Sequence, residues 1–354
     1  MTDPILSVRG LQMRFRHPTK RRTWVHAIDD VDFDVAEGEI VGIVGESGSG
    51  KSTIGRCILG LETPLAGEMV FGGTDLAKHQ MRRNRLDIAR RLQVVFQDPY
   101  SSLNPFRTIG EILIEPVQAT RRVPTDVALE RARDMLEQVG LPREAVDRYA
   151  TQFSGGQRQR IGIARALMMD PRLVICDESV SALDLSTQAQ VLNLLQSLAR
   201  DRGLAYIFIA HDLDVVRYLA DRTVVLYRGR VMEQGDSAAV HADPLHPYTA
   251  ALLAAVPVTD PTEQSERRAL RATARRAAEA TASAAVTTGP ATGHAGCPFA
   301  ARCAFAEPVC TTTRPVDSEV GERAVACHMY AAASGHTRAG LGMPSLAPQK
   351  GRAL

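Results

Sequence analysis

The sequence predicts an α/β protein built around a mostly parallel β-sheet. Short apolar runs at residues 173–176, 206–209 and 224–226 are separated by helical stretches, which is the pattern of βαβ units. A glycine-rich turn follows a further apolar run at residues 39–44, and a pair of carboxylates follows the run at 173–176. These two turns are where the sequence predicts chemistry.

Strands are also expected before the glycine-rich turn. Residues 5–44 alternate in polarity, and Ile28, Val31, Phe33 and Val35 fall on one side at a spacing close to two. This pattern predicts a sheet with one buried face at the start of the chain.

Residues 97–160 differ in pattern and read mainly as loops and helices. We therefore expect a helical subdomain inserted into the α/β core. Near the end of the core, residues 228–230 (RGR) predict a turn between two late strands. No internal repeat is visible, so the sequence predicts one core domain rather than a tandem pair.

Residues 45–52 read GESGSGKS, which matches GxxxxGKS between an apolar strand and a helical stretch. Glycines allow successive backbone N–H groups to face an anion, and the helix N-terminus adds its dipole. Lys51 is expected to reach the β- and γ-phosphates of a nucleotide, and the Ser52 hydroxyl to bind Mg²⁺. The flanking strand and helix disfavour a chance match. The nucleotide-binding residues predicted here are Gly45, Ser47, Gly48, Ser49, Gly50, Lys51, Ser52 and Thr53.

The second motif is the carboxylate pair that ends the strand at residues 173–176. Asp177 is predicted to hold Mg²⁺ through water, and Glu178 to polarise an attacking water as general base. An isolated Asp-Glu pair could instead cap the next helix. That interpretation is disfavoured because the pair follows a buried strand in a chain that already has a phosphate-binding loop.

With these motifs the chain resembles the nucleotide-binding subunits of ATP-binding cassette (ABC) transporters over about residues 5–257. Gln97 in VVFQD is similar to the glutamine loop, and residues 153–157 (FSGGQ) resemble the LSGGQ signature with Phe in place of Leu. Residues 181–184 (SALD) resemble the D-loop, and His211 in IAHD resembles the switch histidine. The resemblance implies an ABC-type P-loop domain with a mostly parallel sheet, antiparallel strands and a helical subdomain.

The resemblance also implies roles for these residues. His211 would contact the γ-phosphate and hold Glu178 and water in place, while Gln97 would sense Mg²⁺ and link the site to the helical subdomain. Ser179 stands where the family usually has proline, but both carboxylates before it are intact. The signature would face ATP bound to a second subunit, so that ATP is sandwiched between two chains; the residues implied are Ser154, Gly155, Gly156 and Gln157.

Members of this family stack an aromatic side chain on the adenine base near the end of the first strand. Phe15 in LQMRF occupies that place in the sequence, and Trp24 is the competing candidate. Either ring could instead pack at the edge of the sheet. The resemblance favours Phe15.

Two segments narrow the resemblance to dipeptide and oligopeptide import ATPases. Residues 97–105 (QDPYSSLNP) are similar to their glutamine loop, with a tyrosine typical of the "F"-type partner, and residues 246–249 (HPYT) resemble the start of their C-terminal extension. The resemblance implies a second ABC ATPase subunit, two transmembrane permease subunits and an extracellular solute-binding protein as partners. It extends to nickel importers, so the solute could be nickel or another small molecule instead of a peptide.

Composition agrees with a partner-dependent membrane role. The chain has 354 residues and a formal net charge of +2, which predicts no general attraction to nucleic acid. Basic residues at 20–22 and 82–85 are interpreted as solvated surface. The N-terminus lacks the pattern of a secretory signal, and no apolar run approaches the ~20 residues of a spanning helix. We therefore expect peripheral attachment to the cytoplasmic side of the cell membrane.

Two other functions are weighed against this one. A soluble ABC ATPase acting on DNA or the ribosome typically has a long coiled-coil insertion or two nucleotide domains in one chain, and neither is visible. A redox or sensing module would use the cysteine-rich end of the chain, with nucleotide as a regulator. The transport ATPase is favoured over both.

Cysteines gather at the end of the chain in the spacing C-x5-C-x6-C-x16-C, at Cys297, Cys303, Cys310 and Cys327. A reducing compartment disfavours disulfides, so four thiols indicate a metal site. The resemblance implies a [4Fe–4S] cluster, with Zn²⁺ as the alternative, although structural zinc sites use shorter gaps. His294 and His328 are interpreted as bystanders. Cys57 and Cys176 lie on core segments and are predicted to be small buried hydrophobes.

Together these patterns predict the organisation of the chain. Residues 5–257 form the ATPase domain, and residues 258–296 form an alanine-rich linker whose first part could be helical. Residues 297–330 are predicted as a cysteine-containing extension, and residues 331–354 as a flexible tail.

Overall fold

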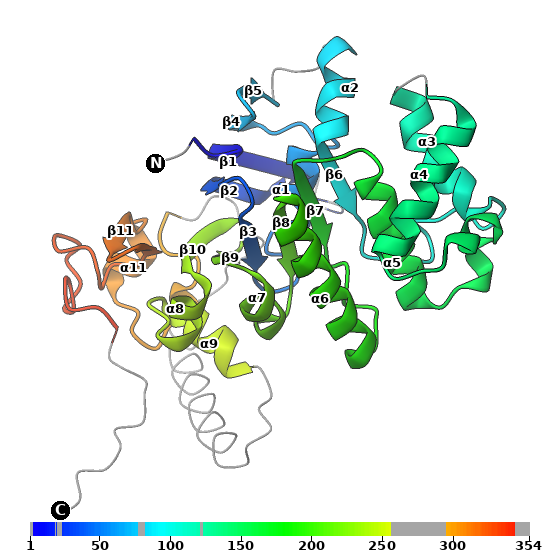
Figure 1. Cartoon of the computed structure of the whole chain (residues 1–354). Coiled ribbons are helices and arrows are strands. Elements are labelled where there is room, and N and C mark those ends of the chain that lie inside the picture. Colours follow the sequence, from blue (N-terminus) through cyan, green and yellow to red (C-terminus); the bar gives the residue numbers. More distant parts are fainter. Residues whose placement is uncertain are drawn as a thin grey trace, which may run out of the picture.

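The computed structural model describes residues 3–17, 19, 23–76, 82–120, 123–255 and 295–343 (Figure 1). Most of the predicted linker, with His294, lies outside the described residues, as do the basic cluster at 20–22 and the end of the predicted tail at 344–354. Within the described part of the chain, no helix combines the length and apolar character needed to cross a membrane.

The first sheet is antiparallel, with strand order β2-β1-β4-β5. The alternation predicted for its second strand is confirmed, because the side chains of Ile28, Val31, Phe33 and Val35 are all buried. The strands are β1 (Leu6–Arg16), β2 (Trp24–Val35), β4 (Ala66–Phe71) and β5 (Thr74–Asp75).

The second sheet is the larger one, with order β11-β12-β10-β9-β3-β8-β7-β6. Its central pairs β9-β3, β3-β8, β8-β7 and β7-β6 are parallel, which confirms the mostly parallel sheet. The parallel strands are β3 (Ile40–Val44), β6 (Leu92–Val95), β7 (Leu173–Asp177), β8 (Ala205–Ala210) and β9 (Arg222–Tyr227), and β10 (Arg230–Asp236) pairs antiparallel with β9. The turn predicted at residues 228–230 joins β9 to β10.

Both faces of this sheet are covered, which explains why its strands read as continuous apolar runs. The helix α1 (Lys51–Ile58) shares one buried cluster with strands of both sheets, through Ile54 and Ile58. On the opposite face lie α6 (Leu185–Arg202) and α7 (Leu213–Leu219), seen below the sheet in Figure 1. The remaining helices of this part are α2 (Arg82–Arg91), α8 (Ser237–Ala242) and α9 (Pro247–Ala255).

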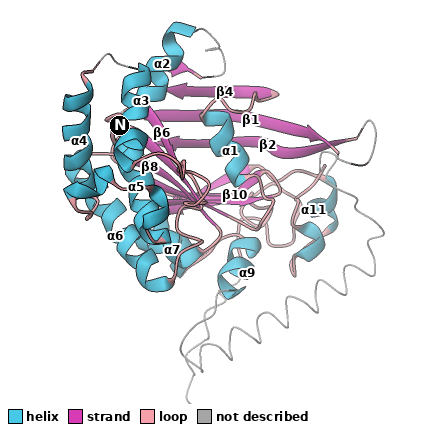
Figure 2. Cartoon of the chain, turned by 90° about the vertical axis from the view of Figure 1, so that its right-hand side faces the viewer, coloured by secondary structure: helices cyan, strands magenta, loops and turns pink. Residues whose placement is uncertain are grey.

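The predicted helical region forms a group of helices at one end of the sheet (Figures 1 and 2). Its apolar side chains, such as Leu113, Leu136 and Ile161, belong to the same buried cluster as Tyr206 and Phe208 of β8. Helices and sheet therefore share a core rather than forming separate units. The elements are α3 (Ile109–Thr120), α4 (Thr125–Gln138), the 3₁₀ turns Arg143–Asp147 and Ala150–Gln152, and α5 (Gly155–Leu167).

The C-terminal segment adds a hairpin to the main sheet. It contains the 3₁₀ turn η3 (Ala300–Arg302), α11 (Pro308–Thr312), β11 (Asp317–Val320) and β12 (Arg323–Ala326). β12 pairs with β10 through Glu233–Val325 and Gln234–Ala324. No pattern in the sequence predicts this pairing.

Residues 331–343, which the sequence placed in a flexible tail, form turns bonded to the segment before them. The Nε2 atom of His336 lies 2.9 Å from the carbonyl oxygen of Phe305, and the Thr337 N–H donates to Glu307 at 3.0 Å. The ordered C-terminal segment therefore continues past residue 330.

Candidate functional site

The glycine-rich loop, called the P-loop below, lies between β3 and α1 and is pressed against two other strands. Gly50 has φ +106°, and a Cβ atom there would lie 2.3 Å from the carbonyl oxygen of Ala27 in β2. A Cβ atom at Gly45 would lie 2.0 Å from the carbonyl oxygen of Leu226 in β9. Only glycine fits these two places without moving the backbone. The middle of the loop, at Ser47 and Gly48, faces solvent.

Lys51 opens α1 with a buried side chain that points back across the loop. Its Nζ atom donates to the carbonyl oxygens of Gly45 at 2.9 Å and Glu46 at 3.2 Å. Burial lowers the pKa of the ammonium, while the carboxylates of Glu178 and Asp177 act in the opposite direction. A cation held by carbonyls in this way is ready to exchange those partners for phosphate oxygens.

The two motifs meet at the start of α1. The Ser52 hydroxyl donates to Oδ1 of Asp177 at 2.7 Å, although 125 residues separate them. Asp177 is the last residue of β7, and hydroxyl and carboxylate oxygens are ligands that Mg²⁺ prefers. The structure therefore brings together two of the three side chains that the sequence assigns to the metal.

Glu178 and Gln97 also meet, just beyond the ends of neighbouring strands. The side-chain amide of Gln97 donates to Oε2 of Glu178 at 2.8 Å. Glu178 has φ +46°, a conformation that costs a non-glycine residue about 1 to 3 kcal/mol. Its N–H donates to the carbonyl oxygen of Ile209 at 2.9 Å, which helps to hold this backbone in place. Strain of this kind is typical of functional sites.

His211 completes the row of predicted catalytic residues along the sheet edge. It directly follows β8, the strand that pairs with β7, and its side chain is exposed. Three adjacent parallel strands thus end beside Gln97, Glu178 and His211. Within the described part of the chain, no hydrogen bond joins the imidazole to Glu178.

The signature residues form the start of α5, where Ser154 and Gln157 are exposed and Gly156 is buried. Ser154 caps the helix: its Oγ accepts from the Gln157 N–H at 3.4 Å, and the Gln157 side chain accepts from the Ser154 N–H at 3.0 Å. Gly156 packs on α6, where a Cβ atom would lie 2.1 Å from Cγ2 of Thr187. In Figure 1 α5 belongs to the helical end of the molecule, apart from α1. Across the described ranges, no hydrogen bond or ion pair connects residues 154–157 to the P-loop.

The two candidate adenine platforms, Phe15 and Trp24, are equally exposed at 37%. Trp24 already has a cationic partner, because the guanidinium of Arg14 lies 4.4 Å from its ring centroid. Phe15 pairs across the sheet with Val25. Exposure does not separate the two rings, so Phe15 stays a prediction.

The four C-terminal cysteines line one small, mainly apolar cavity, called the cysteine cavity below, together with His246, His328 and His336. Burial raises the pKa of Cys297 to about 11 and those of Cys303 and Cys327 to about 12; it raises the pKa of Cys310 as well. Protonated thiols are poor ligands unless a metal displaces the proton.

The cysteine cavity does not have the geometry of a finished metal centre. Among the described residues, no group of three or more His, Cys, Asp or Glu side chains is placed to hold a metal ion. The [4Fe–4S] prediction is therefore not supported by the structure. His328 lies 2.9 Å from the carbonyl oxygen of Thr313 through Nε2. Cys57 and Cys176 are buried, and burial raises both pKa values to about 12.

Sequence reasoning missed the residues that brace the P-loop from outside. Arg302 pairs with Glu46, and the Tyr248 hydroxyl accepts from the Glu46 N–H at 2.9 Å. Tyr248 lies in HPYT, a segment whose resemblance indicated the family but no contact with the P-loop. For Arg302 no signal was available, because the partner lies 256 residues away.

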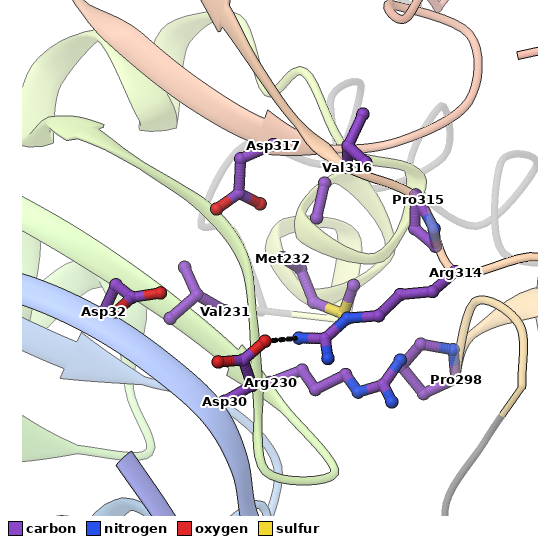
Figure 3. A pocket seen from close by; sticks show the side chains of 11 residues that line it. Asp30, Asp32, Arg230, Val231, Met232, Pro298, Arg314, Pro315, Val316 and Asp317 are labelled. Carbon is purple, nitrogen blue, oxygen red and sulfur yellow. Dashed lines mark ion pairs between the residues drawn. The ribbon is translucent and has the colours of Figure 1, made fainter. Parts of the chain in front are cut away.

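A separate pocket lies between β2, β10 and the C-terminal segment (Figure 3). Asp30, Asp32 and Asp317 contribute carboxylates, while Arg314 and Arg230 contribute guanidinium groups. Arg314 pairs with Asp30 at 2.8 Å, as the dashed line in Figure 3 shows. None of the predicted site residues lines this pocket.

Comparison with protein families gives two matches. Residues 28–181 match the model described as ABC transporter, and residues 232–310 match the C-terminal region of oligopeptide/dipeptide transporters. The second match covers α9 and three of the four C-terminal cysteines.

Curated relatives agree along most of the chain. A putative peptide import ATP-binding protein of Brucella ovis is 49% identical over 324 residues, covering 90% of this chain and 96% of that protein. The oligopeptide transport ATP-binding protein OppF of Bacillus subtilis is 45% identical, covering 75% and 87%. The dipeptide transport ATP-binding protein DppF of Escherichia coli is 41% identical, covering 92% and 95%.

Solved structures show the same fold. One is cbiO1 from Clostridium perfringens, part of an ABC transporter complex, with a TM-score of 0.60 and 26% identity over 68% of this chain and 92% of that one. Another is the dimeric cassette MJ0796 in a post-hydrolysis state with ADP and Pi, with a TM-score of 0.59 and 28% identity over 66% and 98%. The chain is an ATPase that belongs to the ABC transporter family, among the ATP-binding proteins that have the oligopeptide/dipeptide transporter C-terminal region.

Proposed function

We propose that this chain is the ATP-hydrolysing subunit that energises the import of peptides across the cell membrane. The observation that carries the proposal is the meeting of Ser52 with Asp177 and of Gln97 with Glu178 at one edge of the sheet. The peptide solute is supported by the names of the relatives and by the match to the oligopeptide/dipeptide C-terminal region.

The proposed mechanism assigns one task to each side chain. Lys51 and the P-loop N–H groups contact the phosphates of ATP. Ser52 and Gln97 would hold Mg²⁺, with Asp177 acting through water, and the bound ion would neutralise phosphate charge. Glu178 takes a proton from the attacking water, while His211 contacts the γ-phosphate.

We also propose that the chain works beside a second, homologous ABC ATPase. The start of α5 supports this, because Ser154 and Gln157 are exposed and, among the residues that the structure describes, no hydrogen bond or ion pair links residues 154–157 to the P-loop of their own chain. Two permease subunits and an extracellular solute-binding protein complete the proposed transporter, with this chain attached peripherally on the cytoplasmic side. The names OppF and DppF support the "F"-type position. Residues 5–257 would be the ATPase domain and residues 297–330, with the turns after them, its extension.

Transport by the assembled complex tests this function. With the candidate partner subunits in proteoliposomes, ATP should drive uptake of labelled di- or oligopeptides, and Lys51→Ala in this chain should reduce uptake at least tenfold. Labelled Ni²⁺ serves as the competing solute. Uptake of Ni²⁺ without peptides would replace the peptide assignment, and an ATPase that needs no membrane partner would point to a soluble ABC protein.

We also propose that the four C-terminal cysteines bind a [4Fe–4S] cluster with a structural role, with Zn²⁺ as the alternative. Four thiols converge on one apolar space, and sulfur ligands suit either metal. The test is to purify the full chain without oxygen and measure iron, sulfide and zinc, with Cys303→Ser as the matched variant. We expect iron and sulfide in equal amounts, lost in the variant. Zinc without iron would overturn the [4Fe–4S] assignment in favour of a zinc site. If neither metal were found, the four cysteines would be buried thiols without a metal.

A further inference from the structure

The C-terminal segment reaches the P-loop through one arginine. Arg302 forms a bidentate pair with Glu46, the second residue of the loop, with NH1–Oε2 and NH2–Oε1 distances of 2.9 Å each. Bidentate arginine–carboxylate pairs fix orientation as well as charge. Glu46 is thereby tied to a residue far outside the ATPase motifs.

The backbone N–H and carbonyl oxygen of Glu46 are hydrogen-bonded as well. Its N–H donates to the Tyr248 hydroxyl at 2.9 Å, and its carbonyl oxygen accepts from Lys51 at 3.2 Å. Lys51 is the residue expected to contact phosphate. The position of Glu46 therefore bears directly on the geometry of the loop around the nucleotide.

Tyr227, Tyr248 and Phe299 form an aromatic cluster, and Arg302 packs against it. The ring centroids lie 4.5 Å apart for Tyr227–Tyr248, 5.4 Å for Tyr248–Phe299 and 5.5 Å for Tyr227–Phe299. The guanidinium of Arg302 lies 5.4 Å from the Phe299 ring and 3.3 Å from the Tyr227 hydroxyl. This cluster joins β9, α9 and the C-terminal segment into one rigid support.

The positive charge of Arg302 also balances the negative charge of Glu46 next to the expected phosphate site. A carboxylate in a phosphate-binding loop repels the polyphosphate that the loop must hold, and a paired arginine cancels that charge. Arg302 lies in η3, between Cys297 and Cys303 of the cysteine cavity. The support of the loop thus depends on how the C-terminal segment is folded.

We propose that Arg302, with Tyr248, is a positioning residue for the P-loop, and that the C-terminal segment in this way raises the affinity of the chain for ATP. The proposal rests on the proposed nucleotide site, and Lys51→Ala tests that site separately. If the wild-type chain binds nucleotide and Lys51→Ala does not, the site stands, and the Arg302 variants then test the support.

The measurement is calorimetric titration of the full chain with AMP-PNP, a non-hydrolysable ATP analogue, in the presence of Mg²⁺. Because the pair is partly exposed, with 46% and 42% of the two side chains accessible, we expect Arg302→Gln to weaken binding about two- to fivefold. Arg302→Lys should recover part of the loss, since it keeps the charge but not the bidentate geometry. Tyr248→Phe should weaken binding by a smaller factor, because it keeps the ring and loses the acceptor.

A double variant separates the charge of Arg302 from the geometry of its contact with Glu46. Combining Arg302→Gln with Glu46→Gln removes the unpaired carboxylate but does not restore the bidentate contact, so affinity should recover only in part, to a value between those of Arg302→Gln and the wild type. The matched control is Arg314→Gln, which removes another partly exposed ion pair of the same segment, with Asp30, and touches no P-loop residue.

Two results would overturn the proposal. If Arg302→Gln bound AMP-PNP with wild-type affinity, the Arg302–Glu46 pair would not support the P-loop. Equal weakening in Arg314→Gln would assign the effect to general destabilisation of the segment, which thermal unfolding of each variant measures directly. A double variant that binds as weakly as Arg302→Gln would instead assign the whole effect to positioning by the bidentate pair.

Discussion

Replacing Glu178 with glutamine should stop ATP turnover while leaving ATP binding intact. Glutamine keeps the size and hydrogen-bonding shape of the side chain but cannot take a proton from water. The P-loop, Lys51 and Ser52 are unchanged, so the phosphates should still be held. We expect hydrolysis by the assembled complex to fall by ~10²-fold or more.

The measurement pairs phosphate release with nucleotide affinity in the same preparation. Glu68→Gln is the matched control, since it neutralises an exposed carboxylate on β4, away from the site. It should keep normal turnover. Near-normal hydrolysis in Glu178→Gln would show that this carboxylate is not the general base.

Ser154→Asp should abolish hydrolysis through the neighbouring subunit rather than through the chain's own P-loop. Aspartate caps a helix as well as serine does, so α5 should keep its start. The new negative charge would, however, face the γ-phosphate that the partner binds. We expect about 10²-fold slower hydrolysis in the complex, with unchanged affinity of the isolated chain for ATP.

Ser154→Asn separates charge from shape, because asparagine also caps and carries no charge. It should stay within a few-fold of the wild-type rate. If Ser154→Asp weakened nucleotide binding by the isolated chain, the signature would act within its own chain and the two-subunit site would be wrong. Full hydrolysis by a demonstrably monomeric chain would contradict it as well.

The core of the site was predictable because its constraints are local. Gly45 and Gly50 are required by loop conformation and close backbone approach, and Asp177 follows directly from a strand that reads as buried. Parallel strands bring their carboxyl ends to one edge, so Asp177 and Glu178 were expected near the loop. The structure confirms that meeting and adds the Gln97–Glu178 contact.

Other parts were predicted only in outline. The helical region was recognised by its pattern, but the sharing of one core between Leu136 and Phe208 depends on packing. Four cysteines in a short segment indicated convergence, and they do line one cavity. Whether they hold a metal depends on sulfur positions that spacing does not specify. His246 and His336, which also line the cavity, come from separate parts of the chain and were not considered.

By itself, the sequence determined the α/β class, the order of the motifs and the chemistry of the P-loop and carboxylates, because each depends on residues close together in the chain. Only the tertiary structure decided that β11 and β12 extend the main sheet and that Arg302 braces Glu46. The strands β11 and β12 are four residues each, too short for a periodic signal. The Arg302–Glu46 pair joins residues 256 positions apart. The sequence around a charged surface residue does not indicate which opposite charge it will contact, because folding alone brings the two together.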